Sequence, residues 1–543
     1  MRIHIIAFGH YGKWGDIGTF THSEHNEFME SLHVALVLVA VGIALLPYLR
    51  RRRLIGQHSP PGPRGLPVLG NLFQLQGDIW MQSTKWKQQY GDLVFLNVVG
   101  QPILVLNSLR VAVDLLDRRS DIYSDRPKNI VTRDMLCGGR NMVLMDYHAR
   151  YKNLRRVMNA GLTKPASLNY HAFRSREAIS LVRAFLQHPN DWKMHVDNSL
   201  IHLTLSILYG LPETPEEREY AMIKVKEFVD LLSYAGQPGN YLVQYFQWMK
   251  YIPRGIARWK DELMACYEGT STFFQLMYKN GWSGHFTDTT SYQNMSKTIH
   301  EEQDRHGLDD IDASWLMGTL YFAASETTAA QLSWLIIAMK KYPDVQQKAQ
   351  RELDHVIGRN RIPDASDIEN LPYLQAIVKE LFRWATGAPI GVPHCAAQDD
   401  WYNGYFIPKG TVVIVNIWAM HIDKEVYGND AEEFDPSRFL DKEGRISIPS
   451  NLVNDTKSDG HSGFGFGKRA CPGRNVAEDS LHMFALYILW ALKIEPKRTE
   501  DGKPIVISPS DYHSTGVVLH PAPYRCNFSL RFPDVEVMLD SAQ

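Results

Sequence analysis

Apolar residues at helical spacing dominate the chain from about residue 72 onward. This spacing predicts helices at 112–117, 178–186, 200–208, 223–232, 313–341, 345–357 and 372–384. Short β-like runs are fewer and lie at 93–98, 103–105 and 411–415. No linker of biased composition and no internal repeat interrupts the region. The pattern predicts a mainly α fold with minor β sheets (α+β), in a single large domain over residues 72–543.

The segment 313–341 is apolar on all faces, which predicts a long helix through the centre of the protein. Glu326, Thr327 and Thr328 lie in its middle. An ionisable group buried there without a partner costs several kcal/mol. Either the helix turns one polar face to water, or these side chains form a polar notch where chemistry needs a hydroxyl and a carboxyl.

A separate apolar stretch lies near the N-terminus. Residues 32–49 contain one strongly polar side chain, His33, and span roughly 27 Å as a helix, just enough to cross a hydrocarbon core. Four arginines follow at 50–53 and predict a cytosolic location for that side. A cleaved signal peptide is the alternative, but its positive charges would precede the apolar stretch. We therefore expect a lumenal segment (1–31), a transmembrane anchor (32–49) and a basic, Pro-rich hinge (50–71).

Composition narrows the class of protein. The 543 residues carry 58 Lys+Arg and 60 Asp+Glu, a formal net charge of −2, without the basic excess of a dedicated nucleic-acid binder. Hydrophobic residues make up 44% of the chain, enough for a sizeable core. Its five cysteines form no C-x-x-C pair, which argues against zinc fingers and disulfide scaffolds. A large enzyme of a reducing compartment remains.

The segment 463–474, Gly-Phe-Gly-Phe-Gly-Lys-Arg-Ala-Cys-Pro-Gly-Arg, is the most informative. Its alternate glycines allow tight backbone geometry, and Cys471-Pro472 marks the start of an apolar helix. Backbone N–H groups at a helix N-terminus stabilise a thiolate, and Arg469 is expected to add positive charge. An inert buried cysteine is the alternative, but the combination favours a metal-bound or reactive thiolate.

These residues carry a resemblance. The pattern Phe464-x-x-Gly467-x-Arg469-x-Cys471-x-Gly473 is similar, position by position, to the haem-thiolate signature of the cytochrome P450 superfamily. The resemblance extends over nearly the whole chain, and the anchor and Pro-rich hinge look like those of microsomal members. The segment 323–328 resembles the oxygen-activating part of the family's central helix.

Two further motifs resemble a structural network of the family. Glu380-x-x-Arg383 looks like its Glu-x-x-Arg motif, and the segment around Arg438 (436–439) looks like the downstream partner. Glu302-x-x-Arg305 also fits the first motif, and such pairs are common on helix surfaces. Glu380-x-x-Arg383 is therefore informative only because it lies before Arg438 and Cys471 in the chain. The resemblance implies a buried ion-pair network that holds the cysteine loop in position.

The resemblance implies a haem cofactor, iron protoporphyrin IX, with Cys471 as its axial thiolate and iron ligand. Thr327 would hold dioxygen through its hydroxyl, and Glu326 would relay protons. The implied cofactor-binding residues are Tyr151, Arg155, His394, Phe464, Gly467, Arg469, Cys471 and Gly473. Among them Arg155, His394 and Arg469 would hold the haem carboxylates. Tyr151 stands where the family usually has Trp, and its phenol can still donate a hydrogen bond.

Ala324 is a second departure, because the family usually has Gly there. In the family, the missing methyl lets the helix bulge where dioxygen binds. The methyl of Ala324 could crowd that site or be absorbed by a modest shift of the helix. We expect turnover to be slower or less well coupled than in an Ala324→Gly variant.

The implied function is that of a haem-thiolate monooxygenase, which inserts one oxygen atom of O2 into a lipophilic small molecule by hydroxylation or epoxidation. Electrons would come from NADPH through NADPH–cytochrome P450 reductase, at the endoplasmic reticulum membrane, with a single span and a cytosolic catalytic domain. No nucleic-acid partner is expected. In the segments that line the family's pocket, apolar residues outnumber charged ones, which favours a lipophilic substrate. These apolar residues are Ile130, Val131, Met135, Tyr321, Phe322, Ile390, Val392, Val517 and Val518.

Segments 393–410 and 520–526 resemble fungal members of the O-methylsterigmatocystin oxidoreductase type. They suggest secondary metabolism, with a terpenoid substrate favoured and a polyketide or indole also open. Two alternatives have other chemistry. A haem-thiolate isomerase or dehydratase would work without O2 and NADPH, although it has little need of Glu326 and Thr327. A non-enzymatic, membrane-anchored haem protein would bind haem and consume no NADPH.

Overall fold

The computed structural model describes residues 58–212, 214–237, 239–244, 246–286, 293–449, 452, 459–497, 512–515, 517–522 and 524–541. The chain divides into two compact units, Met1–Ser59 with Trp401–Phe406, and Pro60–Asp400 with Ile407–Gln543. The predicted lumenal segment and the anchor at 32–49 lie outside the described residues. Among the helices that are described, none is both long and apolar enough to span a bilayer.

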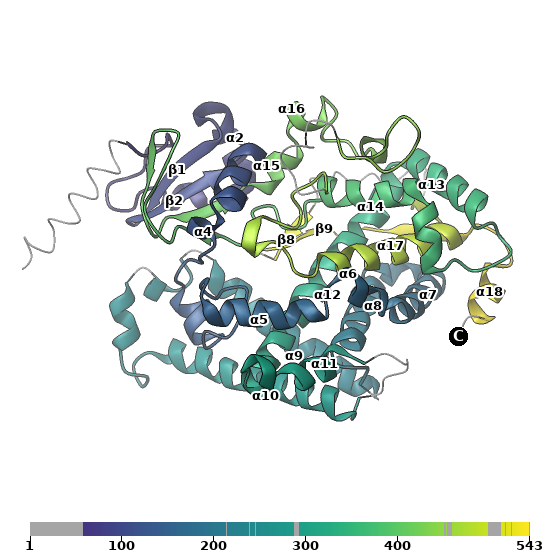
Figure 1. The fold of residues 1–543 in the computed structure, drawn as a ribbon, viewed down its shortest axis with the longest axis horizontal. Coiled ribbons are helices and arrows are strands. Elements are labelled where there is room, and N and C mark those ends of the chain that lie inside the picture. The colour runs from purple at the N-terminus through teal and green to yellow at the C-terminus, as the bar shows by residue number, and fades with distance from the viewer. Residues whose placement is uncertain are drawn as a thin grey trace, which may run out of the picture. The chain divides into compact units, whose positions relative to one another are not determined.

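Helices make up most of the second unit, as the sequence predicts (Figure 1). The α-helices are α2 (Ile79–Tyr90), α3 (Leu109–Ala112), α4 (Ser120–Tyr123), α5 (Ala149–Ala160), α6 (Lys164–Leu168), α7 (His171–Gln187), α8 (Trp192–Leu208), α9 (Pro215–Gly236), α10 (Arg258–Ser283), α11 (Met295–Glu302), α12 (Asp310–Lys341), α13 (Pro343–Val356), α14 (Pro372–Trp384), α15 (Ile417–His421), α16 (Lys424–Tyr427), α17 (Arg474–Ala491) and α18 (Val535–Ser541).

Most predicted helices appear in the structure. The predictions at 178–186, 200–208 and 223–232 lie within α7, α8 and α9, and the prediction at 372–384 matches α14 residue for residue. The segment predicted as a helix at 112–117 is largely the π-helical turn η2 (Val113–Arg118). The 26-residue helix α10 was not predicted from the sequence.

The β structure is minor and lies in small sheets. The strands are β1 (Leu93–Val98), β2 (Gln101–Leu106), β3 (His394–Cys395), β4 (Asp400–Tyr402), β5 (Tyr405–Ile407), β6 (Val412–Val415), β7 (Leu492–Pro496), β8 (Tyr512–Ser514), β9 (Leu519–Pro521) and β10 (Cys526–Leu530). The largest sheet has the order β1-β2-β6-β3, in which only the β2–β6 pair is parallel. The pairs β10–β7 and β8–β9 are antiparallel.

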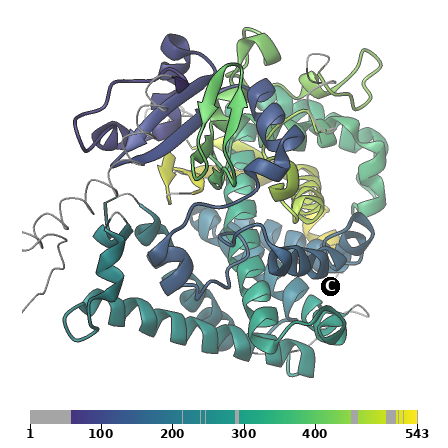
Figure 2. The same cartoon turned by 60° about the vertical axis from the view of Figure 1, so that its left-hand side comes forward.

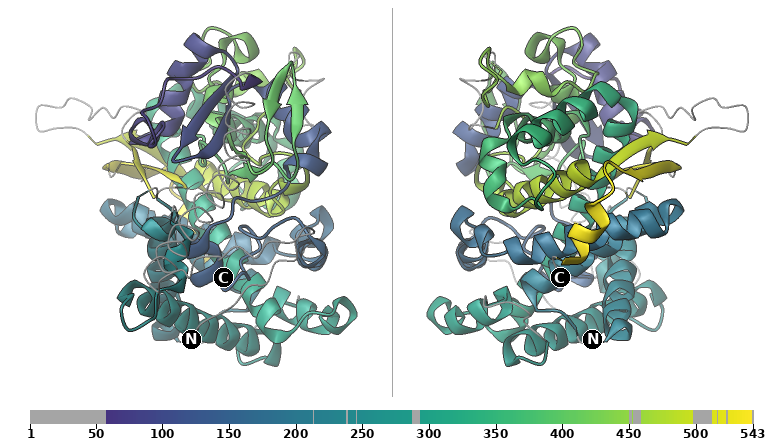
Figure 3. Two further views of the ribbon diagram at one scale, coloured as in Figure 1. Left: turned by 90° about the vertical axis from the view of Figure 1, so that its left-hand side faces the viewer. Right: turned by 90° about the vertical axis from the view of Figure 1, so that its right-hand side faces the viewer.

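Helix α12 is the central element of the helical body, as its apolar composition predicts (Figures 1 and 2). Asp309 caps its N-terminus by accepting a hydrogen bond from the backbone N–H of Asp312, and lysines occupy its last turn, where they oppose the helix dipole. The helix packs against α8, α10, α17 and the strand β9. Figure 3 shows α10 along one end of the body and the β1–β2 pair toward the other.

Two chain segments approach α12 from the C-terminal part of the sequence. Helix α17 begins three residues after Cys471, is largely buried from Asp479 onward, and packs against both α12 and α14. The β8–β9 hairpin reaches α12 through its second strand. At the other end of the chain, the described part of the predicted hinge lies against β1, because the N–H of Phe95 donates to the carbonyl of Pro61 over 2.9 Å.

Candidate functional site

The loop before α17 is folded tightly around Cys471. The backbone N–H of Cys471 donates to the carbonyl oxygen of Phe464 over 2.8 Å and closes the loop. Gly467 has a φ of +56°, and a Cβ there would lie 2.1 Å from the carbonyl oxygen of Leu116. Only glycine fits that position, and the backbone N–H of Gly467 is bound by the carboxylate of Asp117 over 2.5 Å.

The thiol of Cys471 is exposed, although the loop and α17 surround it with protein. Burial raises the pKa of this thiol, whereas a hydrogen bond from the N–H of Gly473 and the charges of Arg155 and Arg474 act to lower it. The positive charge therefore comes from Arg155 and Arg474, not from Arg469 as the sequence suggested. A Cβ at Gly473 would lie 3.9 Å from the Cys471 sulfur, so glycine keeps that side of the sulfur open.

The guanidinium of Arg469 points into a buried cluster of cations. Its Nε donates to the carbonyl of Ser124 over 2.7 Å and its Nη2 to that of Met145 over 2.6 Å, while Nη1 has no hydrogen-bond partner in the described part of the chain. A second buried arginine, Arg126, lies close enough for its pKa to be lowered to about 9, by burial and by the charge of Arg469. It donates hydrogen bonds to the carbonyls of Val143, Val392 and Pro393.

His394 lies beside the two arginines as a neutral imidazole, and we use the name cation cluster for Arg126 and Arg469 together with this ring. Its Nδ1 lies 2.8 Å from the carbonyl oxygen of Tyr123, and burial together with Arg126 lowers its pKa to about 3. Among the described residues, no carboxylate lies within ion-pair distance of Arg126 or Arg469. Buried charges are normally paired. The cluster therefore fits an anionic group that the protein does not itself supply, as the two carboxylates of haem would be.

Tyr151 and Arg155, both on α5, contact the cysteine loop. Tyr151 Oη donates to the carbonyl of Lys468 over 3.2 Å, and Arg155 Nη2 donates to the carbonyl of Ala470 over 2.6 Å. The guanidinium of Arg469 lies 3.8 Å above the ring of Tyr151. The ring of Tyr151 thus packs against one arginine of the buried cluster.

One face of α12 is open where the rest of the helix is buried. Ala323 and Ala324 are half-buried and Thr327 is exposed, although the turns on both sides are buried. Thr327 Oγ1 donates to the carbonyl of Ala323 over 2.7 Å, so its hydroxyl proton is engaged and its oxygen can accept. Tyr321 lies on the opposite side of the helix, edge-on to Tyr209. Its side chain is therefore part of the core and does not share the face of Thr327.

Glu326 does not point to the same place as Thr327. Its Oε1 accepts hydrogen bonds from Thr515 Oγ1 over 2.9 Å and from His520 Nε2 over 3.2 Å, both in the β8–β9 hairpin. Burial acts to raise the pKa of Glu326, but these two hydrogen bonds and the imidazole charge bring it below its usual range. The carboxylate expected to relay protons is thus held ionised by the C-terminal hairpin.

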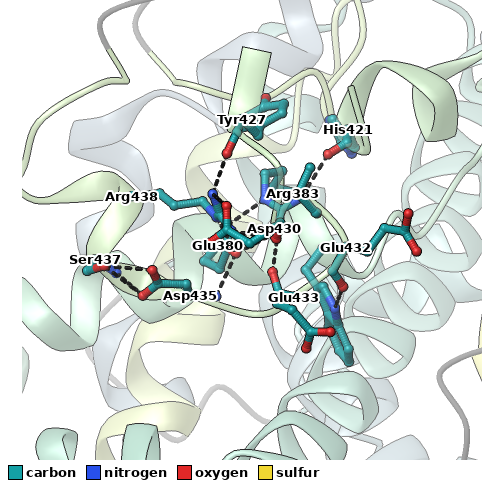
Figure 4. Close-up of polar contacts among 12 residues, drawn as sticks. Glu380, Arg383, His421, Tyr427, Asp430, Glu432, Glu433, Asp435, Ser437 and Arg438 are labelled. Atoms are coloured by element: carbon teal, nitrogen blue, oxygen red, sulfur yellow. Dashed lines mark hydrogen bonds and ion pairs between the residues drawn. The ribbon is translucent and has the colours of Figure 1, made fainter. Parts of the chain in front are cut away.

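The predicted ion-pair network is present, and its Glu380–Arg383 pair is fully buried (Figure 4). Arg383 donates to both carboxylate oxygens of Glu380 over 2.6 Å, and Arg438 Nε lies 3.5 Å from Glu380 Oε1. Burial raises the pKa of Glu380 in spite of Arg383. Arg383 also donates to three backbone carbonyls, those of His421, Ala431 and Glu433. The network ties α14 to the chain before the cysteine loop.

His421 connects this network to the cysteine loop. Its carbonyl oxygen accepts from Arg383, its Nδ1 lies 2.8 Å from Thr386 Oγ1, and its Nε2 accepts the backbone N–H of Ser462 over 2.9 Å. Burial and the charge of Arg383 lower its pKa to about 3, so the ring is neutral. Ser462 lies directly before the loop segment, so the ion pair acts on the loop through one imidazole.

Sequence reasoning missed Arg126 and His421. Neither belongs to a periodic pattern, and both acquire their partners from segments far away in the chain, 266 residues away for the Arg126–Val392 contact. The one local signal for Arg126 is its position directly before Pro127, because a proline restricts the residue that precedes it to an extended backbone. That signal is weak without the fold.

Comparison with known proteins places these features in context. Residues 60–528 match the family model described as Cytochrome P450. A cytochrome P450 monooxygenase of Armillaria gallica is 39% identical over 504 residues, which cover 93% of this chain and 96% of that protein. Cytochrome P450 monooxygenase 58 of Postia placenta is 40% identical over 508 residues (93% and 95%). Cytochrome P450 monooxygenase iboC of Amanita muscaria is 33% identical over 561 residues (96% and 98%).

Proposed function

Because the chain belongs to the cytochrome P450 family and is a haem-thiolate monooxygenase, we propose that it oxidises a lipophilic small molecule at a haem held between Cys471 and the cation cluster. The observation that carries this assignment is the pair of buried arginines, Arg126 and Arg469, without a carboxylate partner among the described residues. The two carboxylates of haem would bind there, and the exposed thiol of Cys471 would hold its iron.

When bound, the haem supplies the iron at which dioxygen is activated. The protein holds the groups around it. Thr327 presents a hydroxyl oxygen on the open face of α12 while its proton is engaged with Ala323. Glu326, one residue earlier, holds a carboxylate that can carry protons to that face once its side chain rotates away from the hairpin.

We assign a lipophilic substrate because the side chains near the open face are apolar. Phe322 is half-buried and lies 5.7 Å from Phe228 of α9, ring centre to ring centre. The fungal relatives support a role in fungal secondary metabolism, for which a terpenoid is the favoured substrate and a polyketide or indole the alternative. The product is a hydroxylated or epoxidised compound.

A P450 monooxygenase also uses a redox partner, and we propose NADPH–cytochrome P450 reductase at the endoplasmic reticulum membrane. Membrane association is supported by the anchor predicted at 32–49 and by an exposed apolar segment between α9 and α10. The large exposed side chains there are Leu242, Phe246, Trp248, Tyr251 and Ile256. Together they suit contact with a bilayer surface. The arginines at 50–53 support a catalytic domain on the cytosolic side.

The proposal is tested with the full-length protein in yeast microsomes that contain the reductase. Spectral titration with terpenoid, polyketide and indole libraries selects ligands, and mass spectrometry then follows product formation. We expect a product that gains one oxygen atom from 18O2 and requires NADPH. Product formation without NADPH or O2 would establish the isomerase or dehydratase alternative. Binding and turnover of polar compounds alone would contradict the lipophilic assignment.

A further inference from the structure

Glu326 accepts hydrogen bonds from two side chains that the family signature does not include, Thr515 and His520. His520 is 6% exposed, and its Nε2 lies 3.2 Å from Glu326 Oε1. Because an ionised carboxylate can only accept, the imidazole is the donor in this contact. The ring of His520 stacks against the ring of His513 with centres 5.2 Å apart, and His513 is exposed. An imidazole thus lies between the carboxylate and the protein surface.

The position of His520 is fixed by the backbone on each side of it. The N–H of Leu519 donates to the carbonyl of Gly387 over 2.8 Å, and the carbonyl of Leu519 accepts from Trp334 Nε1 over 3.0 Å. Trp334 belongs to α12, the same helix as Glu326. The hairpin and the helix are therefore joined two helical turns beyond the carboxylate, which keeps the imidazole within reach of it.

We propose that His520 is a positioning residue that restores the proton of Glu326, so that protons reach the acid–alcohol pair through the β8–β9 hairpin. This inference rests on the proposed monooxygenase function, and it adds the source of the protons. An imidazole takes up and releases a proton near neutral pH, which a hydrogen-bonded amide or hydroxyl such as that of Thr515 cannot do.

The proton balance of the step is simple. The imidazolium of His520 gives the proton on Nε2 to Glu326 Oε1, which leaves a neutral ring and a neutral carboxyl group. Glu326 rotates and releases this proton on the face of Thr327, and its carboxylate returns to the hairpin. His520 is protonated again from water on the side of His513, so one proton moves inward per cycle and nothing is oxidised or reduced.

The charged groups around this path come from two further helices. Asp230 of α9 acts on Glu326 and raises its pKa, against the effects of His520 and Thr515. Burial lowers the pKa of His513, and the charge of His520 and Lys193 of α8 act in the same direction, while Asp197 of α8 opposes them. These directions favour a neutral outer imidazole at His513.

The test uses reconstituted holoenzyme with the reductase and follows NADPH oxidation in H2O and D2O. His520→Gln keeps a hydrogen-bond donor but cannot titrate, and His520→Phe removes both properties. His513→Gln is the matched control, because it makes the same change on the paired strand position. We expect at least fivefold slower NADPH oxidation and a larger solvent isotope effect in both His520 variants. The control should stay within twofold of wild type.

If His520→Gln retained the wild-type rate, His520 would only hold Glu326 by a hydrogen bond and the relay would be refuted. Exchange of imidazole C2 protons, followed by mass spectrometry, gives a readout that does not depend on turnover. In Glu326→Gln holoenzyme we expect the exchange midpoint of His520 to change, because the negative charge beside the ring is removed. An unchanged midpoint would also overturn the proposal.

Failure of the proposed function would look different. A wild-type holoenzyme that oxidised no NADPH under any ligand would contradict the monooxygenase function, and the relay with it, even with the exchange midpoint shifted as expected. Normal NADPH oxidation in wild type with no effect of the His520 variants would refute the relay alone. A normal reduced, carbon monoxide-bound spectrum in each variant shows that the fold and the haem site are intact.

Discussion

The chain contains two Glu-x-x-Arg pairs in opposite environments, and they allow a sharp test of the buried network. Glu380 and Arg383 are both 0% exposed, whereas Glu302 and Arg305 are 40% and 76% exposed and lie 3.2 Å apart. Breaking a buried ion pair leaves an uncompensated charge and costs about 3–5 kcal/mol. An exposed helical pair is worth roughly 0.2–0.5 kcal/mol. Because burial already raises the pKa of Glu380, we expect the loss of its charge to lower the free energy of unfolding by about 3 kcal/mol, near the lower end of that range.

The perturbation is Glu380→Gln, with Glu302→Gln as the control that makes the same chemical change. Guanidinium unfolding followed by tryptophan fluorescence gives the difference in the free energy of unfolding, and haem absorbance gives the fraction of protein that retains the cofactor. We expect the free energy of unfolding to fall by about 3 kcal/mol in Glu380→Gln and by less than about 0.5 kcal/mol in Glu302→Gln. Glu380→Gln should also lose most of its haem. Equal losses in the two variants would refute the network's role in holding the cysteine loop.

Three further predictions follow from the site. Gly467→Ala places a Cβ 2.1 Å from the carbonyl oxygen of Leu116 and should abolish the haem spectrum. Gly465→Ala is the control, because a Cβ there meets no described atom within 4 Å, and it should retain the spectrum. Absorbance spectra of the two purified variants test this difference. The pKa of His421 is lowered to about 3 in the folded state, whereas the imidazole of an unfolded chain titrates at about 6.5. The unfolded state therefore binds the proton first, and the free energy of unfolding falls as the pH drops between these two values. His421→Gln should reduce that fall by about 1.4 kcal/mol per pH unit, and an unchanged slope in pH-dependent unfolding would contradict it. Ala324→Gly should raise the product formed per NADPH, and no gain would refute the crowding of the dioxygen site.

The central helix and the cysteine loop could be predicted because their signals are local. Helix α12 is apolar on all faces, so its existence and extent follow from composition alone, and the start predicted at 313 differs from the observed start at Asp310 by one turn. Gly467 was singled out as part of a motif, and the contact with Leu116 supplies the physical reason for glycine there. Helix α10 was not predicted, although it is 26 residues long and buries one face, with Leu263, Phe273, Phe274 and Met277 among its buried residues.

The partners of the site residues could not be predicted, because they come together only through the fold. Glu326 and His520 are 194 residues apart, so no pattern in the sequence links the carboxylate to the imidazole. The direction of a side chain is equally hidden. Arg469 was expected to stabilise the Cys471 thiolate, and instead its guanidinium turns to the backbone of Ser124 and Met145. The anchor predicted at 32–49 remains a prediction, because it lies outside the described residues.

The reduced, carbon monoxide-bound difference spectrum of the expressed protein tests the central claim most directly. If Cys471 is the axial ligand and the cation cluster holds the carboxylates, the spectrum shows the strongly red-shifted Soret band of a thiolate-ligated ferrous haem. Replacing Cys471 by Ser should remove that band. A band at the position of histidine-ligated or unligated haem, or no haem absorbance from folded wild-type protein, would contradict the account.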